Sequence, residues 1–181
     1  MIYCFLADGF EETEAIAPID ILRRSGVSVT LVGIGGRAVV GAHGIAVGAD
    51  ISDSELGIPD DIDGVILPGG MPGTLNLEKS PAVQRFIDIA ANKGALLAAI
   101  CAAPSILGRK GLLKGKKATC FDGFEQFLEG AEVVDAPSVT DGNIITARGA
   151  GAALEFGFAL AAYLAGKDEA DSLRKGMKCP E

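Results

Sequence analysis

Short apolar runs that alternate with helical patterns constrain the fold of this chain most strongly. Four of these runs are predicted to be buried strands: Met1–Leu6, Ser28–Val32, Gly64–Leu67 and Ala95–Ile100. Strands separated by helices at this spacing are joined by right-handed crossovers, which produce a mostly parallel sheet. The sequence therefore predicts an α/β fold with a doubly wound, mostly parallel sheet and helices on both of its faces.

Further elements are predicted from periodicity and from glycine and proline positions. A helix with an acidic first turn follows the first strand and ends at Gly26, and a small β-hairpin is expected over Arg37–Val47. The remaining expected elements are helices over Pro81–Lys93, from Ala103 to Gly108 and over Ala152–Leu164, and strands over Lys117–Cys120 and Ile144–Ala147.

The length of 181 residues predicts one domain that spans residues 1–181. No internal repeat, low-complexity tract or interdomain linker interrupts it. The polar segment from Lys167 to Glu181 is expected to be a partly mobile tail.

Charge and hydropathy exclude several classes of partner. The 24 acidic and 16 basic side chains give a net charge of −8, which repels nucleic acids and anionic membrane surfaces. Met1–Leu6 has no basic leader, and no apolar run approaches the roughly 20 residues of a membrane span. We therefore expect a cytoplasmic protein with no nucleic-acid or membrane partner.

The cysteines and glycines also argue against common cofactor sites. Cys4, Cys101, Cys120 and Cys179 are far apart in the sequence and form no C-x-x-C pair, as zinc ribbons and dithiol redox motifs require. They are predicted to be free thiols of a reducing compartment. No phosphate-binding glycine loop is present, so we expect neither a metal nor another cofactor.

Cys101 is the strongest candidate for chemistry because of its place between a predicted strand and a predicted helix. Ligands of such sheets bind at the carboxyl ends of the strands. Small residues two positions to either side, Ala99 and Ala103, are typical of a nucleophile elbow, whose tight turn excludes larger side chains. A helix that begins directly afterwards favours the thiolate. The alternative is an unreactive cysteine of the core.

Four segments in order resemble the DJ-1/PfpI superfamily and are closest to its bacterial ThiJ-like DJ-1 branch: Gly9–Glu14, Leu67–Gly70, Ala98–Pro104 and Thr146–Gly151. The resemblance covers nearly the whole chain. It implies a flavodoxin-like fold related to that of class I glutamine amidotransferases. It also implies that Glu14 lies beside the Cys101 sulfur, and that the N–H groups of Gly70 and Ala102 form an oxyanion hole.

Both assignments have a plainer alternative. Glu14 could be a solvated glutamate of the first helical turn, which is the role expected for Glu11 and Glu12. The glycines after Pro68 could form a simple Pro-Gly-Gly turn without a ligand.

Three further residues receive a role from the resemblance. His43, the only histidine, lies in the predicted hairpin, where it lines the pocket of a neighbouring subunit or is an exposed turn residue. Arg24 is assigned to a homodimer contact and Arg148 to the pocket region, with surface salt bridges as the alternative. Ala102 stands where related peptidases and amidotransferases carry a histidine after the nucleophile, which argues against their mechanisms.

The resemblance implies a cofactor-free glyoxalase or deglycase that acts on small α-oxoaldehydes and converts methylglyoxal to lactate. In that reaction Cys101 forms a hemithioacetal and Glu14 moves a proton between the substrate carbons. A redox-sensing stress-response protein in which Cys101 is oxidised to the sulfinate uses the same residues. A chaperone-like protein without catalysis and a flavodoxin-like binding domain are two further hypotheses.

Overall fold

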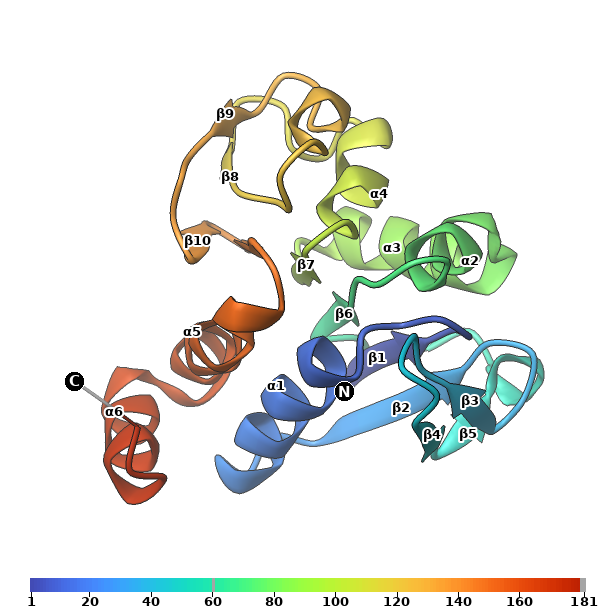
Figure 1. Ribbon diagram of the computed structural model, residues 1–181, viewed down its shortest axis with the longest axis horizontal. Coiled ribbons are helices and arrows are strands. Elements are labelled where there is room, and N and C mark those ends of the chain that lie inside the picture. Colours follow the sequence, from blue (N-terminus) through green and yellow to red (C-terminus); the bar gives the residue numbers. More distant parts are fainter. Residues whose placement is uncertain (60, 180–181) are drawn as a thin grey trace.

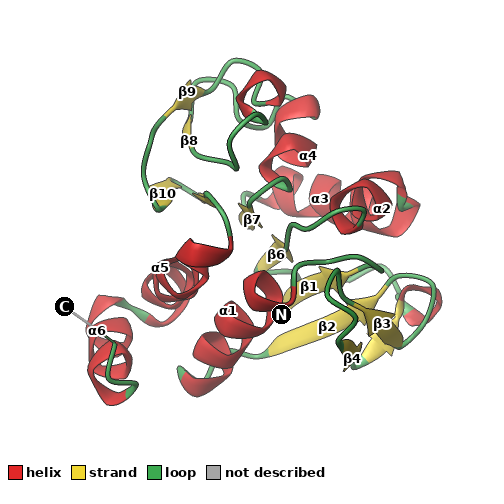
Figure 2. Cartoon of the chain, in the orientation of Figure 1, coloured by secondary structure: helices red, strands yellow, loops and turns green. Residues whose placement is uncertain are grey.

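The computed structural model describes residues 1–59 and 61–179 and shows three layers, a central sheet between two groups of helices (Figures 1 and 2). The sheet has seven strands in the order β10–β11–β7–β6–β1–β2–β5. In chain order they are β1 Ile2–Leu6, β2 Val29–Gly33, β5 Ile51–Ser52, β6 Gly64–Leu67, β7 Leu96–Ile100, β10 Ser138–Asp141 and β11 Ile144–Ala147. Every neighbouring pair is parallel except β10 and β11. The predicted doubly wound α/β fold is confirmed.

Two hydrophobic cores bury the two faces of the sheet. Along β1, Cys4 and Leu6 pack on the side of α1 (Glu12–Arg24) and α5 (Ala153–Ala165). Phe5 points to the opposite side and meets Phe86 edge to face, with ring centroids 5.4 Å apart. Alternate side chains of a strand point to opposite faces, so a strand covered on both sides is apolar throughout. This double burial explains the continuous apolar runs of the sequence.

Three helices cover the second face, and one of them, α3, follows the capping rules of the sequence. They are α2 Gly73–Lys79, α3 Pro81–Lys93 and α4 Pro104–Arg109. In α3 the Ser80 hydroxyl accepts the Val83 N–H, Pro81 occupies the first turn and Gly94 ends the helix in the left-handed region at φ 65°. The predicted bounds of α3 are confirmed.

Several smaller elements lie outside the seven-stranded sheet. The predicted hairpin forms from β3 (Ala38–Val40) and β4 (Ala46–Gly48), and hydrogen bonds from Gly9 to Val40 and from Ala42 to Phe10 hold it against the segment after β1. A separate two-stranded sheet pairs β8 with β9. The remaining elements are β8 Lys117–Ala118, β9 Glu132–Val133 and the 3₁₀ helices Asp53–Glu55, Glu125–Phe127 and Ala150–Ala152.

The predicted polar tail is largely a helix, α6 (Lys167–Gly176), although residues 180 and 181 lie outside the described part of the chain. Within α6 only Ala170 is buried, so hydrophobic periodicity gave little signal. Arg174 of α6 forms an ion pair with Glu155 of α5, and its guanidinium lies 4.3 Å from the centroid of the Phe158 ring. Because these contacts join two separate helices, local sequence patterns could not reveal that the tail packs against α5.

None of the helices in residues 1–59 and 61–179 combines the length and apolar character that a membrane span requires.

Candidate active site

The three segments selected from the sequence converge because their strands are neighbours in the sheet. Strands β7, β6 and β1 lie side by side, and their carboxyl ends continue into Cys101, Gly69 and the segment that leads to Glu14. The parallel direction brings all three ends to one edge. Residues 55 positions apart therefore meet, and Gly69 N–H donates to Glu14 Oε2 over 3.0 Å.

Cys101 occupies a tight turn of the main chain. Its φ of 65° lies in the left-handed region, which costs a non-glycine residue about 1–3 kcal/mol. Hydrogen bonds on both sides hold this conformation, since Cys101 N–H donates to the Ala147 carbonyl over 2.8 Å and Phe121 N–H donates to the Cys101 carbonyl over 2.9 Å. Ala102 and Ala103, the next residues, are buried. The turn has the geometry that the small flanking residues predict.

Glu14 lies beside the Cys101 sulfur and is 1% exposed. Its carboxyl group forms hydrogen bonds with the Cys101 side chain and the Gly69 N–H. Burial raises the pKa of Glu14 to about 7, and these two hydrogen bonds offset part of that increase. The solvated-glutamate alternative is therefore excluded for Glu14.

Two glycines make the close approach possible. A Cβ at Gly69 would lie 2.6 Å from both the Cys101 Cβ and Glu14 Oε2. Gly70 has a φ of 88°, and its N–H, together with that of Ala102, donates a hydrogen bond to the Cys101 sulfur. Two main-chain donors thus converge on the Cys101 sulfur, and their role as an oxyanion hole stays a prediction.

The cysteine and the glutamate compete for one negative charge. Burial, followed by the charge and hydrogen bond of Glu14, raises the pKa of the Cys101 thiol to about 12, although the Gly70 and Ala102 N–H groups act in the opposite direction. The helix-based expectation of a ready thiolate therefore fails while Glu14 is ionised. A thiolate becomes favourable when the carboxyl group holds the proton, because the repulsion then disappears and the acid can donate to sulfur.

We expect Glu14→Gln to remove a pH-dependent loss of stability. The pKa of Glu14 is about 7 in the folded protein against an ordinary value of 4.5, so the native state keeps a proton that the unfolded chain has lost between these values. Wild-type stability therefore falls as pH rises through this window, by about 3 kcal/mol. Urea unfolding at pH 4.5 and pH 8 should show this fall in the wild type and not in the variant. An equal change in both proteins would contradict the assignment.

His43 is exposed and contacts Glu12 rather than Cys101. The Glu12 carboxylate accepts the His43 N–H over 2.8 Å and lies 2.9 Å from His43 Nδ1. Burial opposes this charge, but the hydrogen bonds from His43 and Ile45 outweigh it and lower the pKa of Glu12 to about 2. The expectation that Glu12 is a solvated first-turn residue was wrong, because its side chain is buried and anchors the hairpin to α1.

Glu11 completes a small cluster with Glu12 and His43. The possible metal-ligating atoms of the three side chains lie within 4.8 Å of one another. His43 Nδ1 already contacts both carboxylates, at 3.4 Å for Glu11 and 2.9 Å for Glu12. Hydrogen bonding and charge account for this arrangement, and the Glu11 carboxylate reaches the Cys101 site only through its charge, which adds a smaller increase to the pKa of Glu14.

The two arginines occupy different surroundings. Arg24 pairs with Asp20 at the end of α1, ten residues and about 15 Å of helix beyond Glu14. It is therefore not a pocket residue of its own chain. Arg148 pairs with Asp135 and lines a cavity of about 530 Å³ near Cys101, together with Phe121. This cavity adjoins the Cys101 turn through Phe121, whose N–H donates to the Cys101 carbonyl, and the assignment of Arg148 to the pocket stays a prediction.

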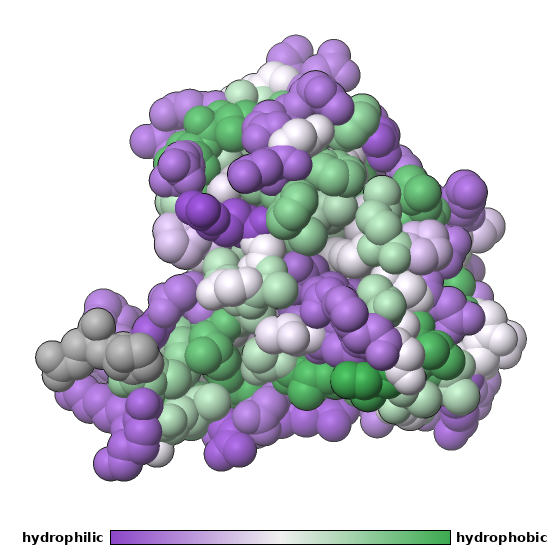
Figure 3. All heavy atoms as spheres, viewed as in Figure 1, coloured by the Kyte–Doolittle hydropathy of each residue, from purple (hydrophilic) through white to green (hydrophobic). Residues whose placement is uncertain are grey.

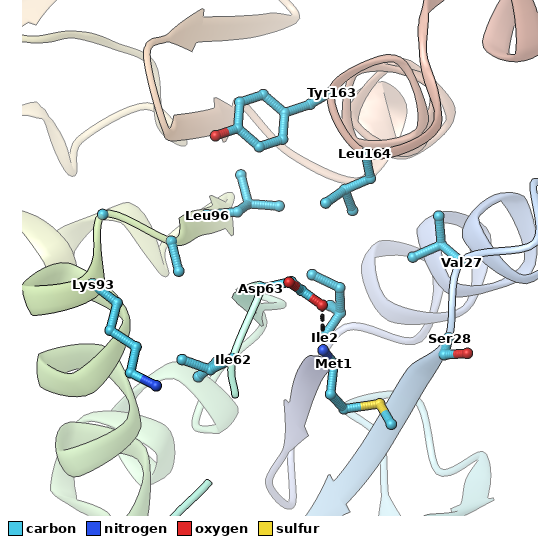
Figure 4. Close-up of a pocket in the computed structure, with 12 residues that line it drawn as sticks. Met1, Ile2, Val27, Ser28, Ile62, Asp63, Lys93, Leu96, Tyr163 and Leu164 are labelled. Carbon is cyan, nitrogen blue, oxygen red and sulfur yellow. Dashed lines mark hydrogen bonds and ion pairs between the residues drawn. The ribbon is translucent and has the colours of Figure 1, made fainter. Parts of the chain in front are cut away.

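A second cavity, of about 730 Å³, lies at the amino ends of the strands (Figure 4). Its lining includes Ile2, Leu96 and Tyr163, and the Met1 ammonium forms an ion pair with Asp63 at its edge. This edge of the sheet is opposite to the one that carries Cys101 and Glu14. Size alone therefore does not identify the reactive site.

Comparison with known proteins agrees with the four motifs. The model of the DJ-1/PfpI family matches residues 1–163. This chain belongs to the DJ-1/PfpI family. Protein dj-1beta of Drosophila melanogaster is 38% identical over 95% of this chain and 93% of its own length. A protein named as a deglycase in Thermococcus kodakarensis is 36% identical over 78% of this chain and 86% of its own. The solved structure of oxidized DJ-1 from Toxoplasma gondii matches with a TM-score of 0.92 and 30% identity over 98% of this chain and 97% of that one.

Local sequence patterns do not reveal two contributors to the site of this DJ-1/PfpI protein. Gly69 has the pattern of an ordinary turn residue, yet it touches both reactive side chains. Phe121 stands out only for its position after Cys120, yet its ring is 50% exposed beside the Cys101 turn. A glycine pair directly after a buried strand could have indicated the first contact, but no local signal places Phe121.

Proposed function

We propose that this DJ-1/PfpI protein is an enzyme that converts methylglyoxal and related small α-oxoaldehydes to 2-hydroxy acids without a cofactor. One observation carries the proposal: a buried carboxyl group with a raised pKa is hydrogen-bonded to the sulfur of Cys101, where two main-chain N–H groups also converge. A titratable pair of this kind can act as nucleophile and proton carrier. The similarity to an archaeal protein named as a deglycase supports enzymatic chemistry.

The first step is addition to the aldehyde. With the proton on Glu14, the Cys101 thiolate forms an S–C bond to the aldehyde carbon, and the C=O electron pair moves to oxygen. The N–H groups of Gly70 and Ala102, which point at the sulfur in the free protein, are near enough to stabilise the developing oxyanion. Glu14 then gives its proton to that oxygen and leaves a hemithioacetal and a carboxylate.

The second step moves a proton between carbons. The Glu14 carboxylate removes the hydrogen from the carbon bonded to sulfur, and the electrons form an enediolate with its negative charge on the oxygen of the adjacent carbon. Glu14 then delivers the proton to that adjacent carbon, the proton of the first hydroxyl passes to the second oxygen, and the thioester of lactate remains. Water attacks the thioester, lactate leaves and the thiol is regenerated. A pKa of about 7 suits a group that both takes and gives a proton near neutral pH.

Turnover by the purified protein tests this proposal directly. Methylglyoxal is supplied without glutathione, its loss is followed and lactate is measured by chiral chromatography. We expect stoichiometric conversion with an excess of one lactate enantiomer, because the proton is delivered by a fixed side chain. No lactate, or racemic lactate at the rate of a buffer blank, would reject the enzyme proposal. The same assay with a methylglyoxal adduct of a free amino acid tests the deglycase reaction.

A redox sensor is the second candidate, favoured by the fold match to an oxidized DJ-1 structure. The N–H groups at the Cys101 sulfur and a protonated Glu14 could hold the oxygens of a sulfinate. We expect two equivalents of hydrogen peroxide to add two oxygen atoms at Cys101, as measured by intact and peptide mass. Cys4, which is 0% exposed, is the internal control and should stay unmodified. Modification of Cys4 before Cys101 would count against the sensor.

We also propose a homodimer that uses the apolar face formed by α1, β4 and α5. Ile16, Ile45 and Leu154 are exposed there beside Val47, and Figure 3 shows hydrophobic residues gathered where α1 and the hairpin meet. Exposed apolar side chains gathered on one face mark interaction surfaces. His43 and Arg24 lie on the hairpin and helix that form this face, so their proposed roles belong to the dimer.

We expect Ile45→Glu to weaken that dimer about 100-fold, because a charge would be buried between apolar side chains. Sedimentation velocity over a concentration series measures the change. Ile58→Glu is the matched control, since Ile58 is 75% exposed and lies away from this face. A wild-type monomer at all concentrations, or equal masses for both variants, would contradict the proposed interface.

A further inference from the structure

The cavity beside the Cys101 turn is larger than a three-carbon aldehyde requires. It measures about 530 Å³, within the range of sites that bind drug-sized ligands. We call it the Phe121 cavity, and its lining consists of Phe121, Asp122, Pro137, Arg148, Gly149, Ala150, Gly151 and Ala152. The proposed reaction on methylglyoxal leaves most of this space unused.

The main chain places this cavity next to the reactive residue. Its two walls begin where Cys101 makes its backbone hydrogen bonds, with Ala147 directly before Arg148 on one side and with Phe121 on the other. The main chain of Cys101 therefore lies within one residue of both walls. Strand β11, which ends at Ala147, is the neighbour of β7 on this side.

The opposite side of Cys101 offers no such space. There Gly69 is so close that an added Cβ would come within 2.6 Å of the cysteine and of Glu14. At Gly70 a Cβ would lie 2.3 Å from the Glu11 nitrogen. The β6 side of Cys101 is therefore closely packed, and the Phe121 cavity is the space that adjoins this turn on its β11 side.

The chemistry of the walls indicates which substituent they would accept. Phe121 is 50% exposed, and because residue 149 is a glycine, no side chain from that position covers the ring, where a Cβ would lie 3.3 Å away. Among the residues that the structure describes, the Arg148 guanidinium pairs with Asp135 alone, whose side chain is 95% exposed, and such surface pairs contribute little. Aromatic rings stack on other rings and on guanidinium groups.

We propose that the Phe121 cavity binds an aromatic arm attached to the reacting carbon, and that Phe121 and Arg148 are its specificity-determining residues. The preferred electrophiles of Cys101 are then aryl-substituted carbonyl compounds rather than methyl-substituted ones. The inference rests on the same reactive cysteine as the proposed function, but the selectivity of the cavity does not require turnover.

Alkylation of Cys101 tests the cavity without the enzymatic reaction. The sulfur displaces iodide from iodoacetamide or from iodoacetanilide, which adds a phenyl arm, and peptide mass spectrometry gives the rate at Cys101 alone. The ratio of the iodoacetanilide rate to the iodoacetamide rate at Cys101 is divided by the same ratio for glutathione, which corrects for the intrinsic reactivity of the two reagents. We expect the corrected preference for the phenyl reagent to fall about tenfold in Phe121→Ala, less in Phe121→Leu, and about threefold in Arg148→Gln. Arg85→Gln, at an exposed position of α3, should match the wild type.

The outcome that overturns the inference is an equal preference in wild type and Phe121→Ala, with both proteins folded by melting temperature. Phenylglyoxal and methylglyoxal give a second reading through kcat/KM, where the aryl substrate should lose about tenfold in Phe121→Ala and the methyl substrate less than twofold. If neither aldehyde is turned over while the alkylation preference depends on Phe121, the proposed function fails and the aromatic cavity stands. If both aldehydes are turned over but neither the alkylation preference nor kcat/KM depends on Phe121, the proposed function stands and the aromatic cavity fails.

Discussion

Replacement of Cys101 by alanine is expected to reduce kcat/KM for methylglyoxal at least about 10³-fold. The reason is covalent: every later step of the proposed reaction takes place on a carbon bonded to this sulfur. Because the Cys101 side chain fills a turn beside Gly69 and removal of one atom creates little space, the variant should fold. Lactate formation and melting temperature are measured on the same samples.

A second cysteine variant shows whether the loss of activity is specific to Cys101. Cys179→Ala is the matched control, since this thiol lies after α6 and away from the carboxyl edge of the sheet. It should keep wild-type turnover. Residual activity of Cys101→Ala within about tenfold of the wild type would exclude covalent catalysis, whatever the fate of the other thiols.

Replacement of Glu14 by glutamine is expected to reduce turnover by about 10²–10⁴-fold while Cys101 remains reactive. Glutamine keeps the size of the side chain and can still accept the Gly69 N–H, but it can neither take nor give the proton that moves between the substrate carbons. The charge that raises the pKa of Cys101 disappears at the same time. Alkylation of Cys101 by iodoacetamide at pH 7 should therefore become faster as catalysis is lost.

This opposite response distinguishes a proton carrier from a structural residue. A variant that merely disturbed the site would lose alkylation and turnover together. The pH dependence of alkylation gives the direct readout, since the apparent pKa of Cys101 should move down toward the ordinary thiol value in Glu14→Gln. An unchanged profile would mean that the carboxyl group does not act on the sulfur, and the proposed mechanism would fail.

Much of the fold was predictable because its signals are local. The strands β1, β2, β6, β7 and β11 coincide with apolar runs, since a strand covered on both faces must be apolar throughout. The bounds of α3 follow from Ser80, Pro81 and Gly94, which act within one turn of the helix ends. In contrast, β10 has no fully buried residue and α2 follows a proline-glycine segment, so neither had a distinctive pattern.

The candidate site was predictable in part. The parallel direction of the strands followed from the alternation of elements, and it brings Cys101 and the Glu14 segment to the same edge of the sheet. The family resemblance supplied the pairing of the two side chains. The buried state of Glu12 was not predictable, because its partners lie 31 and 33 residues away in the hairpin.

The sequence by itself determined the elements, the parallel sheet and the position of one cysteine at a strand end, because these depend on periodicity and on residues within a few positions of one another. Only the tertiary structure decided the protonation chemistry. Glu14 and Gly69 are 55 residues apart, and both their contact and the burial that raises the pKa of the acid exist only after the strands have paired. A pKa depends on the dielectric surroundings and neighbouring charges in space, and long-range packing alone assembles those.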